Sequence, residues 1–351
     1  MVEPKRILIF NVNWLGDVLF STAAIRNIRY AFPESFIACV IPPRCVPVLE
    51  GNTHLNEVIV FDEQKEHKGI LGKIRFLLYL RRKRFDVAYL LHRSMSRTLL
   101  AALAGIGRRI GYVTKKRAWL LTERIVPPDI RRVHRIDYYL GVLQGAGIEI
   151  KDRFTEFFVR DEDIRAVEAF LAGQGVSEDD VLIGINPGGN WGPKRWPTEA
   201  FAALAERAAQ ELPCRVILTG SAGDQPLADF IAARVKSAPI NACGRLTLKQ
   251  FGVLAHILNV FITADSGPLH IANAVGCRRI IALFGPTDPA ITGPYPADTT
   301  TIIQKNSGCA IPCYTVDCPD NRCMKAITVD EVMRAITTLM TPAEGSAPQA
   351  R

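Results

Sequence analysis

Short, almost wholly apolar runs alternate with longer amphipathic stretches along this chain, and that alternation limits the folds it can adopt. Residues 36–41 and 87–91, for example, hold only apolar side chains and one tyrosine. A strand with one face in water alternates apolar and polar side chains, whereas a continuously apolar strand has both faces covered. The pattern therefore predicts an α/β fold in which helices cover both faces of parallel sheets.

The alternation runs through the first half of the chain and begins again near residue 181. Predicted strands lie at 6–10, 36–41, 57–61, 87–91, 154–159, 181–186, 215–220, 260–265 and 279–284. Predicted helices lie at 18–30, 76–82, 96–104, 198–211, 225–235, 248–258 and 328–340. A chain of 351 residues exceeds what one hydrophobic core usually serves, so we expect two domains, 1–160 and 161–342. The last helix has the first domain as an alternative packing partner, and 343–351 has the composition of a disordered tail.

Positive charge is concentrated in three clusters, all in the first half of the chain. The formal net charge is +8, and the clusters lie at 81–84, 107–117 and 131–135. Such clusters are either solvated faces or binding surfaces for nucleic acid, an anionic bilayer or a polyanionic ligand. Aromatic residues do not interleave with these charges, which argues against single-stranded nucleic acid. We therefore expect no nucleic-acid partner.

The hydropathy of the chain predicts a cytoplasmic protein. No apolar run approaches the roughly 18 residues of a membrane-spanning helix. The first apolar stretch, at 7–10, is too short for a secretory signal and fits a first strand.

The nine cysteines fall into two groups. Five lie in or beside apolar segments, as small core residues of a protein in a reducing compartment do. The other four, Cys309, Cys313, Cys318 and Cys323, lie within one short segment. Four thiolates can bind zinc, but structural zinc sites usually hold two closely spaced pairs with a long gap between them. We therefore predict local disulfides or free thiols here, with a metal site as the alternative.

The segment Ala-Asp-Ser-Gly-Pro-Leu-His, which ends an apolar run and opens a helix, is the strongest candidate for a binding site. Asp265 ends the predicted strand, Ser266 suits a helix N-cap and Pro268 suits the first helical turn. The first turn of a helix presents free N–H groups and the positive end of the dipole, which suits a phosphate, and the intervening glycine lets a ligand come close. His270, one turn into the helix, would flank the same spot. The alternative is an ordinary capped turn.

Two further loops follow predicted strands of the second half. Gly188 and Gly189 leave the backbone open, and Lys194 in the same loop offers a positive charge to a phosphate oxygen. Ser221 lies in a Gly-rich turn that suits an anion or a nucleoside hydroxyl. Ligands of open α/β sheets bind at the carboxyl ends of strands. No Walker lysine follows a Gly-rich loop, so these loops fit a nucleoside diphosphate better than a triphosphate.

The loop after the first predicted strand carries Asn13, Gly16 and Asp17. Asp17 would lie at the carboxyl edge of the first sheet, at the start of a helix. It is either a helix N-cap or a carboxylate that faces a cleft between the domains and acts as a general base.

Taken in order, these motifs resemble those of the bacterial lipopolysaccharide heptosyltransferases, glycosyltransferase family 9. The resemblance covers about residues 5–340. The segments that carry it are GDVL at 16–19, STAAIR at 21–26, NPG at 186–188, PKRWP at 193–197, DSGPLHIA at 265–272 and FGPTDP at 284–289.

The resemblance implies a GT-B fold, in which two Rossmann-like parallel-sheet domains face a cleft. It implies an inverting transfer of L-glycero-D-manno-heptose from ADP-heptose to the anionic inner core of lipopolysaccharide, with no cofactor and no catalytic metal. The donor would bind mainly to the second domain and the acceptor to the first, with peripheral contact to the inner leaflet of the inner membrane. The four-cysteine segment favours the type II enzymes of the family.

The resemblance also implies roles for individual residues. Asp17 matches the general base and Lys194 the catalytic lysine that contacts the diphosphate. The predicted donor-binding residues are Gly188, Gly189, Lys194, Ser221, Asp265, Ser266, Gly267, Pro268 and His270. The predicted acceptor-binding residues are Asn13, Gly16 and Asp17. Two other hypotheses are a family 9 enzyme that moves another sugar in O-antigen or protein glycosylation, and a non-catalytic protein that binds a nucleotide sugar or a polyanion.

Overall fold

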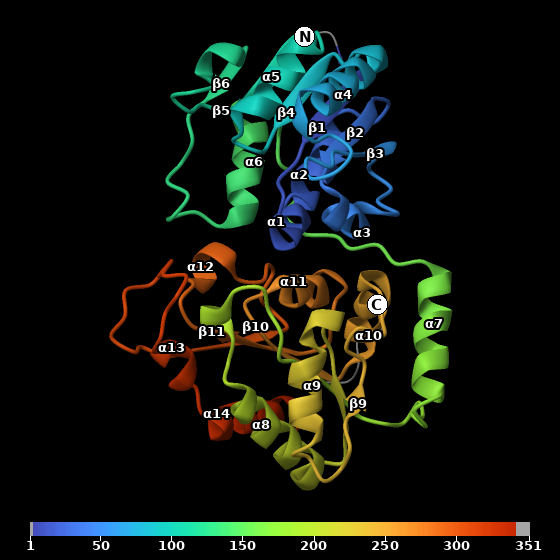
Figure 1. Ribbon diagram of the computed structural model, residues 1–351, viewed down its shortest axis with the longest axis vertical. Helices are drawn as coiled ribbons and strands as arrows, with labels where there is room; N and C mark the ends of the chain where they lie inside the picture. Colours follow the sequence, from blue (N-terminus) through green and yellow to red (C-terminus); the bar gives the residue numbers. More distant parts are fainter. Residues whose placement is uncertain (1–2, 342–351) are drawn as a thin grey trace. The chain divides into compact units, whose positions relative to one another are not determined.

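The computed structural model describes residues 3–341, which divide into two α/β units (Figure 1). The first unit contains residues 3–160 and Ala290–Tyr295, and the second contains Asp161–Pro289 and residues 296–341. Each unit is built around a parallel sheet, as predicted from the apolar strands. The predicted tail at 343–351 lies outside the described residues.

The first unit holds a sheet with six strands in the described part of the chain, in the order β3-β2-β1-β4-β5-β6, all parallel. The strands are β1 Arg6–Phe10, β2 Phe36–Ile41, β3 Glu57–Val60, β4 Val87–Leu90, β5 Arg108–Tyr112 and β6 Glu123–Ile125. This is the strand order of a Rossmann fold, and it reverses between β1 and β4. Open α/β sheets bind ligands at that reversal, beyond the carboxyl ends of the strands.

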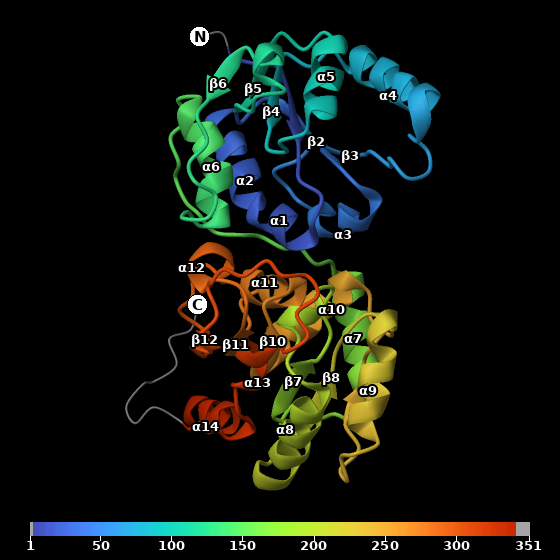
Figure 2. The same cartoon turned by 60° about the vertical axis from the view of Figure 1, so that its left-hand side comes forward.

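Helices cover both faces of this first sheet (Figure 2). They are α1 Leu15–Phe20, α2 Thr22–Ala31, α3 Val46–Leu49, α4 Gly69–Lys83, α5 Met95–Leu103 and α6 Arg135–Gly145, with single 3₁₀ turns at Pro43–Cys45 and Ala118–Leu120. Helices α4 and α5 share a core with alternate strand residues such as Leu8 and Phe10. Ile7 and Ile9, which point the other way, are equally buried, because α1, α2 and α6 lie on that side.

The second unit repeats the topology of the first. Its strands are β7 Leu182–Asn186, β8 Arg215–Leu218, β9 Ile240–Asn241, β10 Val260–Ala264, β11 Ile280–Phe284 and β12 Thr300–Gln304. Their order is β12-β11-β10-β7-β8-β9, which is the Rossmann order counted from β7. The reversal therefore falls between β7 and β10.

The helices of the second unit also lie on both faces of its sheet. They are α7 Asp161–Ala172, α8 Thr198–Glu211, α9 Gln225–Ala232, α10 Leu248–Ile257, α11 Gly267–Ala274, α13 Arg322–Lys325 and α14 Val329–Met340, with 3₁₀ turns at Gly192–Lys194 and Ala222–Asp224. The short helix α12, Pro289–Thr292, begins where the chain passes to the first unit. Helices α8, α9 and α14 share one core with the sheet, while α10 packs against α7 and α11.

The last helix, α14, packs within the second unit. Val332, Met333 and Ile336 of α14 are buried in the core that contains α8 and the second sheet. A capping box between Thr328 and Glu331 fixes where the helix starts.

Two of the predicted elements differ from the structure. The apolar stretch 154–159 forms no strand. The predicted helix at 18–30 is two helices, α1 and α2, which break at Ser21. The Ser21 hydroxyl donates to the carbonyl of Val18 at 2.6 Å and accepts from Asn11 Nδ2 at 2.8 Å, so it bonds to local groups at the break.

Candidate active site

A lysine, an aspartate and a threonine meet in the second unit where β7, β10 and β11 end. The carboxylate of Asp265, which directly follows β10, is only 3% exposed. Its Oδ2 accepts hydrogen bonds from Lys194 Nζ at 2.7 Å and from Thr287 Oγ1 at 2.6 Å. Because β10 lies between β7 and β11 in the sheet, the loops after these strands emerge at one edge. The structure therefore brings together two of the predicted residues and adds Thr287.

His270 lies on the other side of the same carboxylate. Its Nε2 is 3.5 Å from Asp265 Oδ1. Burial alone would raise the pKa of Asp265, but the hydrogen bond to His270 and the charge of Lys194 outweigh it and hold the pKa well below its usual range. The carboxylate thus stays ionised and fixes the Lys194 ammonium, which also lies 5.4 Å from the centre of the Trp191 ring.

The start of α11 is adjacent to this ion pair. The helix begins at Gly267 with Ser266 as its N-cap, as predicted, although the Ser266 side chain makes no capping hydrogen bond. Pro268 has no N–H, and the N–H of Leu269 donates to the carbonyl of Ser266 at 3.2 Å. The N–H of Gly267 is therefore the group of this turn best placed for an anion. A helix N-terminus beside a lysine is an arrangement that binds phosphate.

Gly188 and Ser221 are brought together by Asp224. A Cβ at Gly188 would lie 2.4 Å from the Asp224 carboxyl group. The same carboxylate accepts hydrogen bonds from the N–H of Ser221 at 2.9 Å and from its hydroxyl at 2.7 Å. The glycine is therefore required by close packing of two loops, and Ser221 caps a 3₁₀ turn. Gly189 has more space, with 3.9 Å between an added Cβ and the nearest atom.

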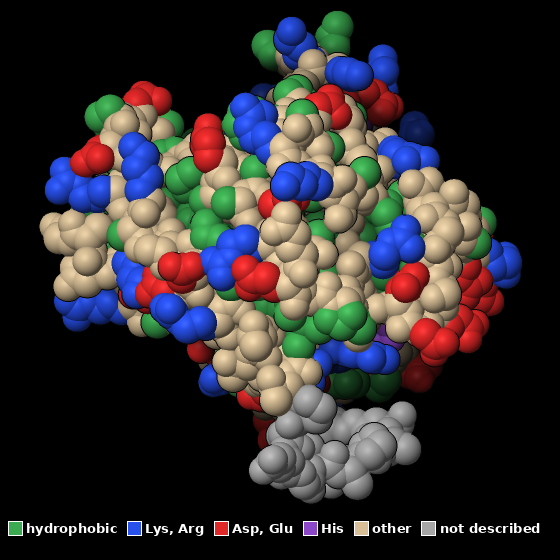
Figure 3. Space-filling model, turned by 90° about the horizontal axis from the view of Figure 1, so that it is seen from below, with side chains coloured by type: hydrophobic (Ala, Val, Ile, Leu, Met, Phe, Trp, Pro, Cys, Tyr) green, Lys and Arg blue, Asp and Glu red, His purple; other side chains and the backbone are tan. Residues whose placement is uncertain are grey.

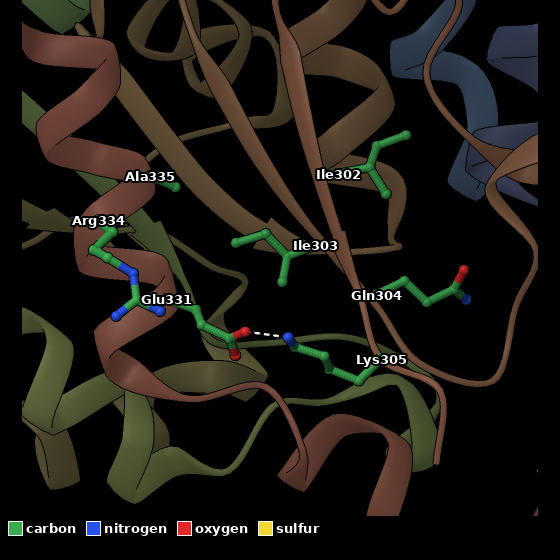
Figure 4. A pocket seen from close by; sticks show the side chains of 7 residues that line it. All are labelled: Ile302, Ile303, Gln304, Lys305, Glu331, Arg334 and Ala335. Atoms are coloured by element: carbon green, nitrogen blue, oxygen red, sulfur yellow. Dashed lines mark ion pairs between the residues drawn. The ribbon is translucent and has the colours of Figure 1, made fainter. Parts of the chain in front are cut away.

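A shallow hollow of about 320 Å³ lies along the edge strand β12 (Figure 4). Ile303, Lys305, Glu331 and Arg334 contribute to its lining, and no predicted site residue does. An ion pair between Lys305 and Glu331 joins the end of β12 to α14. We assign this hollow to the packing of α14 and not to catalysis.

In the first unit, Asp17 is in the first turn of α1 and is half-buried. Trp14 occupies the N-cap, so the interpretation of Asp17 as a cap is wrong. Asp17 Oδ1 accepts a hydrogen bond of 2.8 Å from the hydroxyl of Tyr139. Burial and then the charge of Asp17 raise the pKa of Tyr139 well above its usual value, so this hydroxyl keeps its proton and donates it. Gly16 precedes Asp17 in the same helical turn.

Asn13 is held at the reversal between β1 and β4 by a buried arginine. Arg97, which is 2% exposed, donates to the carbonyl of Asn11 and to Asn13 Oδ1, both at 2.7 Å. Asn13 Nδ2 lies 3.3 Å from His92 Nε2. Burial, together with the charges of Arg97 and Arg117, lowers the pKa of His92 to about 4. His92 therefore offers a neutral imidazole, and Asn13 an oriented amide, at the carboxyl edge of the first sheet.

The arginines of the second basic cluster are mostly used within the fold, which corrects the hypothesis that the whole cluster meets a ligand. Arg117 is fully buried and donates to the carbonyls of Tyr112 and His92. Arg108 pairs with Glu123, and Arg109 donates to backbone carbonyls. The lysines at 115–116 remain exposed.

All nine cysteines are free thiols, so the predicted local disulfides are absent and the free-thiol alternative agrees with the structure. Cys309 is exposed and Cys323 is buried. Within residues 3–341, no three His, Cys, Asp or Glu side chains are grouped as ligands of a metal ion. Over the same described range, no helix is both long and apolar enough to span a bilayer.

Three residues that bond to predicted site residues were not themselves predicted as site residues. They are Thr287, Tyr139 and Arg97. Thr287 follows β11, which lies beside β10 in the sheet. Its position after a predicted strand could have identified it as a candidate. Tyr139 lies in the helix α6, which was not predicted, and Arg97 lies between Ser96 and Thr98 at the start of a predicted helix. No local pattern in the sequence distinguishes those two.

Two Rossmann-type units with charged groups at their strand reversals are typical of enzymes that bind nucleotides, and comparison with known proteins identifies the family. The family model described as glycosyltransferase family 9 (heptosyltransferase) matches residues 74–321. The chain therefore belongs to glycosyltransferase family 9.

Relatives and solved structures agree with this assignment. Lipopolysaccharide heptosyltransferase 2 of Salmonella typhimurium is 30% identical over 302 residues, which cover 82% of this chain and 85% of that protein. The structure of a family 9 glycosyltransferase from Veillonella parvula has a TM-score of 0.86 and 26% identity, and the match covers 97% of this chain and 98% of that one. The E. coli ADP-heptose lps heptosyltransferase II structure has a TM-score of 0.78 and 25% identity, over 95% and 98% of the two chains. The predicted family, enzyme class and GT-B fold are confirmed.

Proposed function

We propose that this enzyme transfers L-glycero-D-manno-heptose from ADP-heptose to the inner core of lipopolysaccharide, with inversion, as a type II heptosyltransferase. The observation that carries the proposal is the Lys194–Asp265–Thr287 cluster beside the start of α11. The names of relatives from S. typhimurium and E. coli, both called lipopolysaccharide heptosyltransferase 2, support the choice of substrates.

The diphosphate of the donor would be held in the second unit. The Lys194 ammonium and the N–H of Gly267 would supply positive charge, and the hydrogen bond to Asp265 orients the lysine. Charge develops on the leaving diphosphate during transfer, and preorganised groups of this kind lower the barrier most. Of the predicted donor-binding residues, Gly188 and Ser221 would act indirectly, by shaping the two loops that they join.

The acceptor would be activated in the first unit, where Asp17 acts as the general base. Its carboxylate takes the proton of an acceptor hydroxyl while that oxygen forms a bond to the anomeric carbon of heptose. The bond from this carbon to the diphosphate breaks on the opposite face, and ADP leaves with the electron pair. Tyr139 is a positioning residue, because its hydroxyl fixes the orientation of the carboxylate. Asn13 and Gly16 would line the acceptor side, and peripheral contact with the bilayer would bring the enzyme to its acceptor.

A donor and acceptor panel tests this proposal. The purified protein is incubated with ADP-heptose or with ADP-, GDP- and UDP-hexoses, and with lipopolysaccharide that carries no heptose or one heptose. We expect product only from ADP-heptose and the acceptor that already carries one heptose, as seen by mass spectrometry. Transfer of another sugar would favour the related hypothesis of a family 9 enzyme in O-antigen or protein glycosylation.

A further inference from the structure

Helix α4 presents an apolar stripe on the side that faces away from its own core. Gly72, Phe76 and Leu80, spaced four residues apart, are buried beneath the helix. The opposite side carries large apolar side chains with high exposed fractions: Ile70 78%, Leu71 80%, Ile74 45% and Leu78 50%. At 3.6 residues per turn, positions 70, 74 and 78 form one continuous stripe. Soluble proteins rarely expose such a stripe without a partner.

Positive charge surrounds this stripe. α4 contains no acidic residue and five basic ones: Lys73, Arg75, Arg81, Arg82 and Lys83. Lys83 pairs with Glu57 at 2.7 Å, and the other four are exposed. Lys65 and Lys68 before the helix and Arg84 after it are exposed as well.

The acidic groups nearest in sequence are fewer than these basic ones, and Asp86 after the helix accepts hydrogen bonds from the N–H groups of Lys5 and Arg6. Glu63 pairs with Arg97 at 3.3 Å, and Asp62 accepts hydrogen bonds from backbone N–H groups of its own turn. Glu66 is exposed in the segment before the helix. On the face of the molecule shown in Figure 3, acidic and basic side chains are largely interspersed, as on an ordinary solvated surface.

We propose that α4 docks on an anionic lipid bilayer, with its apolar stripe in the boundary between headgroups and acyl chains. A helix with an exposed apolar side, flanking lysines and arginines and no acid has the properties of an interfacial helix. The basic side chains would contact lipid phosphates, each strengthening attachment about fivefold on an anionic surface. A second copy of this chain fits less well, because pairing two α4 helices would bring like charges together. A free phosphate or sugar would leave the stripe uncovered.

Vesicle binding of the full-length protein tests this surface without using donor or acceptor. The protein is sedimented with vesicles of phosphatidylcholine alone, or of phosphatidylcholine and phosphatidylglycerol in equal parts. We expect binding to the anionic vesicles only, weakened by salt. The stripe variant Ile70→Asn/Leu71→Asn/Ile74→Asn and the charge variant Arg75→Gln/Arg81→Gln/Arg82→Gln should each bind at least tenfold more weakly.

The second unit offers a matched control. Ile164 and Arg165 of α7 are consecutive and exposed, as are Ile74 and Arg75 of α4. The double variant Ile74→Asn/Arg75→Gln should lose several-fold in affinity for anionic vesicles, whereas Ile164→Asn/Arg165→Gln should bind like the native protein. Circular dichroism and stabilisation by ADP check that every variant is folded.

Three outcomes would overturn the proposal. They are equal or absent binding to the two kinds of vesicle, full binding by folded α4 variants, and equal losses in the α7 control. Sedimentation velocity adds a fourth, because a native oligomer that the α4 variants dissociate would assign the stripe to a second copy of the chain. None of these results depends on which sugar the enzyme transfers.

Discussion

Asp17 carries the proton transfer in the proposed mechanism, so its replacement by asparagine is the sharpest test at the scale of one side chain. The amide cannot accept the proton, and kcat should fall by about 10²–10⁴. Affinity for ADP, measured by calorimetry, should not change, because the proposed donor groups belong to the second unit. Tyr139→Phe should lower kcat less, since it only releases the carboxylate from its orientation. A folded Asp17→Asn enzyme with normal turnover would remove Asp17 from the mechanism.

Replacement of Lys194 should weaken binding of the diphosphate and leave binding of the nucleoside unchanged. Lys194→Ala removes a charge-assisted contact worth roughly 1.5–3 kcal/mol, so ADP should bind at least tenfold more weakly. Adenosine should bind as before, and the exposed Lys236→Ala should leave both affinities unchanged. Calorimetry that finds equal losses for adenosine and ADP would contradict the assigned role.

His92 should make stability depend on pH in the mildly acidic range. Its pKa is about 4 in the folded protein and about 6.5 in an unfolded chain. Between these values the unfolded state binds more protons, so the free energy of unfolding falls as pH drops from about 6.5 to about 4. Above the unfolded pKa, His92 is neutral in both states, so the free energy of unfolding has its full value there. Urea unfolding of the native protein and His92→Gln across this range should show a steeper loss in the native protein, and parallel curves would refute the assignment.

Residues of the candidate site could be proposed from the sequence one at a time, whereas the side chains that they contact could not. Asp265, Lys194 and Asp17 follow predicted strands, where ligand groups of α/β proteins gather. Lys194 and Asp265 are 71 residues apart in sequence, and Asp17 and Tyr139 are 122 apart. No periodicity links residues at such separations, because only the strand order of the folded sheet brings them together.

At the scale of elements, the loops after β7 and β8 depend on the absence of a side chain at Gly188. Gly188→Ala places a methyl group 2.4 Å from the Asp224 carboxyl group, and overpacking of this kind costs about 1–3 kcal/mol. Gly192→Ala in the same loop meets no atom within 4 Å and should leave stability nearly unchanged. Thermal unfolding of the two variants checks the difference, and equal melting temperatures would show that the loops adjust freely.

Most central strands were predictable, whereas of the edge strands β3 was predicted and β6, β9 and β12 were not. The bounds of β1 and β2 match the prediction because strands covered on both faces must be apolar throughout. β9 has only two residues, and β12 at the other edge is only partly buried, so neither shows a clear apolar run. β5 begins with Arg108 and Arg109 and was interpreted as part of a charge cluster.

At the scale of the whole molecule, transfer should continue in the presence of a chelator. In the proposed mechanism, Lys194 and the start of α11 provide the positive charge that the diphosphate needs. Turnover after dialysis against EDTA should therefore equal that of the untreated enzyme, and added Mg²⁺ should not raise it. Elemental analysis of the same sample shows whether the cysteines at 309–323 hold zinc. Loss of turnover that Mg²⁺ alone restores would contradict the proposed role of the lysine.

The number of folding units could be predicted from the chain length, but the residues that belong to each unit could not. A length of 351 residues and the restart of the apolar pattern near residue 181 predict two domains. Nothing in the sequence marks Ala290–Tyr295 as part of the first unit. That assignment depends on tertiary contacts, such as the one between His134 Nε2 and the carbonyl of Gly293 at 3.0 Å.

This late segment has a consequence for how the protein matures on the ribosome. Domains generally fold as units, the N-terminal one first, while the chain is being translated. Here the first unit lacks its final piece until residue 295 has left the exit tunnel, and His134 cannot meet Gly293 or Tyr295 before then. The second unit still awaits β12 and α14 at that moment. Both units are therefore completed only after residue 295 has been translated, and a premature stop anywhere before that residue leaves neither of them whole.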